Sequence, residues 1–188
     1  MAMHTSDVDL VDELKPRVMT LRMIVGALAG GVMAFAALAV LTRAAAPQEP
    51  VDERAQLLTL LALGLFPVAL LASRILPAVM VKKARRQIGA GFDFTSIKQG
   101  PGAFLSELGE AGALVGVYRT KTIIAAAVLE GAALFGVFAF LLEGSLIALG
   151  LAVLLVAAIV AMFPSASRIA GWIERQLRQM DEEKLLVR

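Results

Sequence analysis

The stretch 122–143 constrains this chain most, because it is apolar over enough residues to cross a bilayer and holds one carboxylate, Glu130, in its interior. A bilayer core about 30 Å thick is crossed by about 20 apolar residues in a helix. An ionised group at that depth costs roughly 3 to more than 10 kcal/mol. Glu130 is therefore expected to face protein or water, to be paired, or to stay protonated.

Small residues surround Glu130 at helical spacing. Ala127 and Gly131 lie four residues apart, as do Ala132 and Gly136, and such pairs let a second helix approach closely. The same spacing occurs in an earlier apolar stretch, where it is less specific because glycine is frequent in membrane helices. Close helix packing is therefore predicted at Gly26, Gly30, Ala127, Gly131 and Gly136.

The composition favours a membrane protein without metal or thiol chemistry. Of the 188 residues, 59% are hydrophobic, a share that soluble domains rarely reach, and the mean hydropathy is +0.78. The chain has no cysteine, and its single histidine, His4, lies in the N-terminal tail. Disulfides, thiolate metal sites and a histidine-dependent catalytic triad are therefore not expected. We predict no catalytic residue, cofactor or metal site, and no enzyme activity.

An all-α chain with four membrane spans is predicted, at residues 23–41, 57–81, 122–143 and 146–163. The tight turn at 143–145 makes the fourth span return antiparallel to the third. Pro67 and Pro77 interrupt the second span, and Pro16 interrupts a short amphipathic helix before the first. The predicted fold is an integral membrane four-helix antiparallel bundle in which residues 1–188 form one membrane domain.

The polar segments are expected to lie on the cytoplasmic side of the membrane. The loop 82–121 opens with a basic cluster, and its part 103–118 is expected to be helical and to continue into the third span. A C-terminal amphipathic helix is predicted at 165–185, at the headgroup level or against the basic loop. The cluster predicts contact with anionic lipids rather than with nucleic acid, through Lys82, Lys83, Arg85 and Arg86.

The positive charges predict the orientation. Three Lys and Arg residues precede the first span, seven lie in 82–121 and five lie from Arg168 onward, whereas the first turn holds Arg43 and Arg54. The positive-inside rule then places both termini and the loop 82–121 in the cytoplasm. The expected location is the inner (plasma) membrane of a bacterial cell.

Arg74 and Glu130 are predicted to form an ion pair within the membrane. Arg74 lies eight residues before Lys82, and Glu130 lies eight residues after Thr122, so each lies about 12 Å from the same edge at 1.5 Å per residue. Two opposite charges in hydrocarbon cost less together than apart. The alternative is that Arg74 extends to the headgroups while Glu130 is protonated.

Two resemblances involve the residues around Glu130. Ile123-Ile124 through Leu129-Glu130-Gly131-Ala132-Ala133-Leu134-Phe135, together with Pro164-Ser165, resembles a group of uncharacterised bacterial multi-span membrane proteins, which implies location and architecture. Leu129-Glu130-Gly131-Ala132 followed by Leu134-Phe135-Gly136 is similar to the carboxylate helix of the proteolipid subunit c of rotary ATP synthases. That resemblance implies Glu130 as an ion carrier, although the Gly-x-Gly ladder of that family's partner helix is missing here.

Three functions follow from these features. The first is an integral membrane protein with a structural or accessory role, whose partners are the lipid bilayer and either a second copy of itself or a membrane complex. The second is a proton- or ion-translocating subunit that uses Glu130. The third is a small-molecule transporter, supported by the prolines of the second span.

Overall fold

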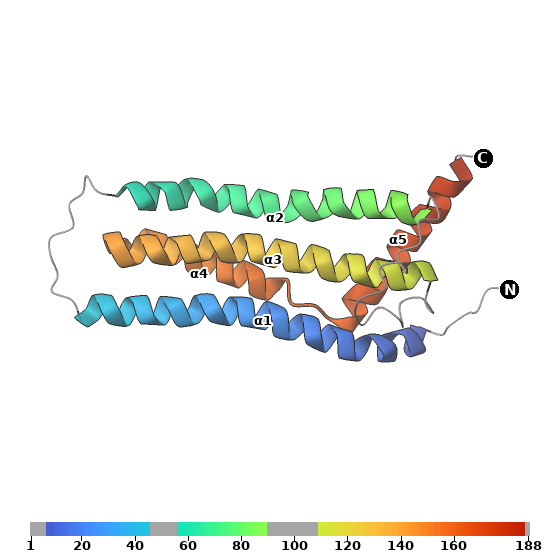
Figure 1. The fold of residues 1–188 in the computed structure, drawn as a ribbon, viewed down its shortest axis with the longest axis horizontal. Coiled ribbons are helices and arrows are strands. Elements are labelled where there is room, and N and C mark those ends of the chain that lie inside the picture. Colours follow the sequence, from blue (N-terminus) through green and yellow to red (C-terminus); the bar gives the residue numbers. More distant parts are fainter. Residues whose placement is uncertain (1–6, 46–55, 90–108, 187–188) are drawn as a thin grey trace. The chain divides into compact units, whose positions relative to one another are not determined.

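The computed structural model describes residues 7–45, 56–89 and 109–186, and the regular structure within these ranges is entirely α-helical. The all-α prediction is confirmed for this part of the chain. The helices, drawn in Figure 1, are α1 (Asp7–Ala45), α2 (Leu57–Gly89), α3 (Gly109–Glu143), α4 (Leu146–Ala161) and α5 (Ala166–Leu186).

Three helical segments are long and apolar enough to cross a membrane, namely Val18–Ala45, Leu57–Ile88 and Ala111–Glu143. They contain the first three predicted spans, and each helix continues beyond its predicted span. The predicted fourth span is shorter, since α4 has 16 residues and a helix of that length covers about 24 Å. It reaches a spanning length only together with Ala166–Glu183, to which it is bent by 72°.

The side chains of α2 are arranged with small residues inside and large apolar residues outside. The buried positions include Thr59, Ala62, Ala69 and Ser73, whereas the exposed fractions of Leu60 and Leu71 are 64% and 61%. Soluble proteins rarely leave so much contiguous apolar surface open to water. This arrangement suits a helix surrounded by lipid, where large apolar side chains face outward at no cost.

The prolines do not break the helices that contain them. α1 is one helix from Asp7 to Ala45 and passes through Pro16, so the predicted interruption at Pro16 is wrong. α2 likewise continues through Pro67 and Pro77. A proline removes one backbone hydrogen bond, and helices that pack against neighbours tolerate this loss.

The described chain divides into two compact units, which we consider separately. The second unit consists of Arg22–Leu76 and Ile123–Phe163. Its core holds many small side chains, so that backbones come close: a Cβ added at Gly136 of α3 would lie 3.0 Å from the carbonyl oxygen of Ala148 and 3.3 Å from Cβ of Ala152. The buried residues of α3 and α4 include Ala126, Leu129, Ala133, Val137, Ala148, Ala152, Leu155 and Ile159.

The turn between α3 and α4 depends on Gly144. Its φ of +71° lies in the left-handed region, which glycine enters without the steric cost that a Cβ imposes. Its N–H donates a hydrogen bond of 2.8 Å to the carbonyl oxygen of Phe140 and closes the end of α3. The predicted tight turn is confirmed, and it directs α4 back along α3.

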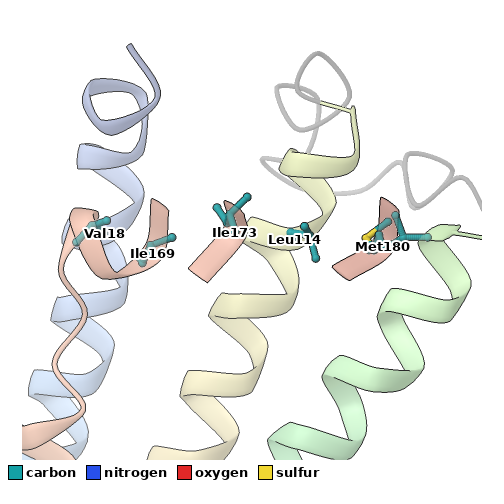
Figure 2. Packing of buried hydrophobic residues seen from close by; sticks show 6 residues of the cluster. Val18, Leu114, Ile169, Ile173 and Met180 are labelled. Atoms are coloured by element: carbon teal, nitrogen blue, oxygen red, sulfur yellow. The ribbon is translucent and has the colours of Figure 1, made fainter. Parts of the chain in front are cut away.

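The first unit consists of Met1–Leu21, Pro77–Thr122 and Pro164–Arg188. Figure 2 shows α5 packed across the ends of three other helices, with Ile169 beside Val18 of α1 and Ile173 beside Leu114 of α3. The predicted amphipathic helix at 165–185 is therefore confirmed as α5, and its apolar face is covered by protein. The buried cluster comprises Val18, Ile88, Leu114, Ile169, Ile173 and Met180.

Candidate functional site

Glu130 lies at the border between the buried and the exposed faces of α3. Its carboxylate is half-buried, and among the described residues it makes no hydrogen bond or ion pair. On one side of it lie the buried Ala126 and Ala133, and on the other side lie the exposed Ala127 and Gly131. An unpaired carboxylate thus adjoins an open strip of small residues.

Arg74 is exposed on α2 and is not joined to Glu130. Arg85 of the same helix does form an ion pair, with Glu183. Ser73, one residue earlier, is buried and donates to the carbonyl oxygen of Leu70 at 2.8 Å. Successive residues of a helix are rotated by about 100° about its axis, so Arg74 is directed away from the inner face of α2. This direction agrees with the alternative prediction that Arg74 extends to the headgroups.

The predicted packing residues behave differently from one another. Gly136 lies in close contact with α4, and a Cβ at Gly26 would lie 3.6 Å from Phe163. At Gly30 and Gly131 a Cβ would meet nothing within 4 Å, and Ala127 is exposed. Within one chain, the small residues therefore serve close packing at Gly136 and leave the strip beside Glu130 open.

The basic cluster at the end of α2 is partly neutralised by α5. Arg85 Nη2 forms an ion pair with Glu183 at 2.5 Å, and Arg85 Nη1 donates to Gln179 Oε1 at 2.5 Å. Arg85 therefore joins α2 to α5 within the first unit. The sequence had predicted only a contact with lipid for this residue. The other three members of the cluster are exposed: Lys82, Lys83 and Arg86.

Glu143, the last residue of α3, caps the beginning of α2. One carboxylate oxygen accepts the N–H of Leu58 at 2.6 Å, and the other accepts the N–H of Thr59 at 2.8 Å and its hydroxyl at 2.6 Å. The first N–H groups of a helix have no partner within the helix and carry partial positive charge. The first turn of α2 has no acidic residue of its own, so a residue from another helix supplies this cap.

Arg43 of α1 completes the network by capping the end of α3. Its Nη1 donates to the carbonyl oxygens of Leu141 and Leu142 at 3.3 and 3.4 Å, and the last turn of α3 has no basic residue. A cation at a helix C-terminus satisfies its free carbonyl groups. Sequence reasoning missed both caps. The signals present were an acidic residue, Glu143, at the end of one apolar run, and an earlier apolar run from Leu57 whose first turn has no acidic residue.

A Gly144→Ala substitution is expected to destabilise the second unit. A side chain at positive φ costs roughly 1–2 kcal/mol, and the new Cβ would overlap the guanidinium of Arg43 and displace it from α3. Thermal unfolding in detergent, followed by the loss of helical circular dichroism, measures the effect. Gly150→Ala is the matched control, because a Cβ there meets nothing within 4 Å and alanine favours a helix. Equal stability of the two variants would contradict this account of the turn.

Lys121, Tyr118 and Trp172 form a cluster in the first unit that sequence reasoning also missed. The two rings meet edge to face with their centroids 5.3 Å apart. Lys121 Nζ lies 3.8 Å from the Trp172 centroid and 4.4 Å from the Tyr118 centroid, a geometry in which the ring quadrupoles attract the cation. Trp172 lies 51 positions after Lys121 in the sequence, so their spacing gave no signal.

Comparison with protein-family models, with curated proteins and with solved structures finds no match for this chain. Within the described ranges, no group of three or more His, Cys, Asp or Glu side chains is placed to hold a metal ion.

Proposed function

We propose that this chain is an integral membrane protein of the bacterial inner membrane with a structural or accessory role and no catalysis. In this proposal α1 to α4 form a four-helix antiparallel bundle with both termini in the cytoplasm. The observation that carries it is the outward display of large apolar side chains, such as Leu60 and Leu71, on helices whose inner positions are small. A surface of this kind requires lipid or another apolar partner as its surroundings.

The proposed topology is testable because the chain has no cysteine. In Asp52→Cys the thiol is expected to react with a membrane-impermeant maleimide in spheroplasts, since the first turn is proposed to face outward. In Lys98→Cys it is expected to react only after lysis, since the segment that joins α2 to α3 is proposed to be cytoplasmic. Equal labelling of both variants in spheroplasts, or recovery of the protein in the soluble fraction without detergent, would contradict the proposal.

A second candidate function, ion translocation through Glu130, is favoured by the absence of a partner for this carboxylate among the described residues. The similarity of the surrounding stretch to the proteolipid subunit c supports it. A carboxylate that carries a proton needs an accessible and neutral form, and the half-buried position beside an open strip suits that need.

The Glu130→Gln variant separates the two functions. Under the structural proposal we expect proton flux in liposomes to be the same for wild-type and variant protein. Thermal stability in detergent is expected to stay equal or to rise, because the change removes an unpaired carboxylate from the span. A pH-dependent, carbodiimide-sensitive flux that the substitution abolishes would instead establish ion translocation.

The proposed partners are the bilayer and either a second copy of the chain or a membrane complex. The strip formed by Ala127 and Gly131 is open and of the small-residue type that lets helices approach closely. Arg74 and Glu130 do not pair within one chain. The proposed pair would therefore join Arg74 of one copy to Glu130 of a second copy. Extraction from native membranes followed by mass measurement of the intact complex identifies the partner.

A further inference from the structure

Three cations gather around the Tyr118–Trp172 ring pair of the first unit. Lys121 lies over both rings, Arg168 is within electrostatic range of Tyr118, and Arg175 is within electrostatic range of Lys121. All of them belong to α3 and α5. Like charges that lie close together repel one another, and an anion bound among them would remove that repulsion.

The positions on α5 explain why the charges converge. Arg168 and Arg175 stand four residues before and three residues after Trp172, so the three side chains share one flank of the helix. Arg175 extends back over Gly171, where its Nη1 would lie 3.7 Å from a Cβ. Trp172 thus has an arginine on each side along α5, and Lys121 Nζ lies over its ring.

The charges of this cluster are not balanced by acids. Within the described part of the chain, no carboxylate lies within 4 Å of Lys121, Arg168 or Arg175. The contrast with α2 is direct, because there Arg85 is paired with Glu183. Among its described residues, α5 therefore supplies an acidic partner to Arg85 but none to Lys121, Arg168 or Arg175, whose charges remain free to bind an anion.

We propose that Lys121, Arg168 and Arg175, arranged around Tyr118 and Trp172, form a binding site for a phosphate-bearing anion. An ammonium acts as a point charge toward phosphate, and a guanidinium offers a planar fork of N–H donors. A lipid headgroup and a soluble phosphate compound share this chemistry. Trp and Tyr side chains are enriched at the headgroup level of membranes, which suits the first source.

Trp172 reports on this site directly, because it is the one tryptophan of the chain. The full-length protein in zwitterionic phosphatidylcholine nanodiscs is titrated with inorganic phosphate, and separately prepared with increasing shares of phosphatidylglycerol. A saturable change in Trp172 emission is expected from at least one of the two. A response to phosphatidylglycerol alone identifies a lipid headgroup site, and a response to phosphate identifies a site for soluble anions; each supports the proposal.

Charge-neutralising variants test the residues. Lys121→Gln and Arg175→Gln are each expected to raise the half-saturating concentration about fivefold, the effect of one phosphate-facing charge. Arg175 is exposed, so its replacement is compatible with folding even if that of Lys121 is not. Arg119→Gln, which removes an exposed charge of α3 outside the proposed site, is expected to change the half-saturating concentration less than twofold. The absence of a saturable response to either ligand, or an equal shift in Arg119→Gln and Arg175→Gln, would overturn the proposal.

Discussion

The Gly136→Leu variant is expected to lose about 1–3 kcal/mol of stability or more, because it overpacks a contact between two backbones. Even a Cβ at this position would lie 3.0 Å from the carbonyl oxygen of Ala148. A backbone carbonyl cannot rotate away as a flexible side chain can. α3 and α4 are therefore expected to separate, and the loss is measured as a lower midpoint of thermal unfolding in detergent.

Gly131→Leu is the matched control on the same helix. A Cβ at Gly131 meets nothing within 4 Å, so the larger side chain is expected to change the stability of the isolated chain by less than about 0.5 kcal/mol. If both variants lost the same stability, the close contact at Gly136 would not be what holds α3 to α4. A Gly131→Leu variant that is stable in detergent but no longer co-purifies with its native complex would place a partner helix on the open strip.

The Ile173→Ala variant is expected to release α5 from the ends of the other helices. Ile173 is 2% exposed in the middle of the cluster of the first unit, and truncation of a buried isoleucine costs about 2–5 kcal/mol. That cost falls on the docking of α5, since its apolar face packs against Val18, Ile88 and Leu114 in this cluster. Undocked α5 is expected to be cut by trypsin after Arg175 and Arg178 at a higher rate.

Limited proteolysis of the protein in detergent measures this release. Leu185→Ala is the control, because Leu185 belongs to the same helix and is 73% exposed, so its truncation is expected to leave the cleavage rate unchanged. An unchanged rate in Ile173→Ala would mean that something other than this cluster, such as the surface of the micelle, holds α5 in place.

The features that depend on length and local chemistry were predictable. An apolar run of sufficient length gives a helix wherever it occurs, so 122–143 lies within α3. The turn at Gly144 followed from a glycine between two such runs, because glycine there enters positive φ. The amphipathic pattern of residues 165–185 likewise predicted α5 and the face that it buries.

The features that depend on rotation about a helix axis were not predictable. Arg74 and Glu130 were matched by depth, yet depth says nothing of direction, and a shift of one residue turns a side chain by about 100°. Arg74 therefore points outward although Ser73 beside it is buried. The caps by Glu143 and Arg43, and the stacking of Lys121 on Trp172, also require knowledge of which helix ends meet.

The caps at one end of the second unit have a consequence for biosynthesis. The N-terminus of α2 is completed by Glu143, a residue that the ribosome adds about 85 positions later. Until α3 has been synthesised, the first amide groups of α2 therefore lack the carboxylate that caps them. Arg43 likewise lacks the carbonyl groups of α3 to which it donates. A truncated product that lacks α3 therefore leaves the first amide groups of α2 without their cap and Arg43 without its acceptors.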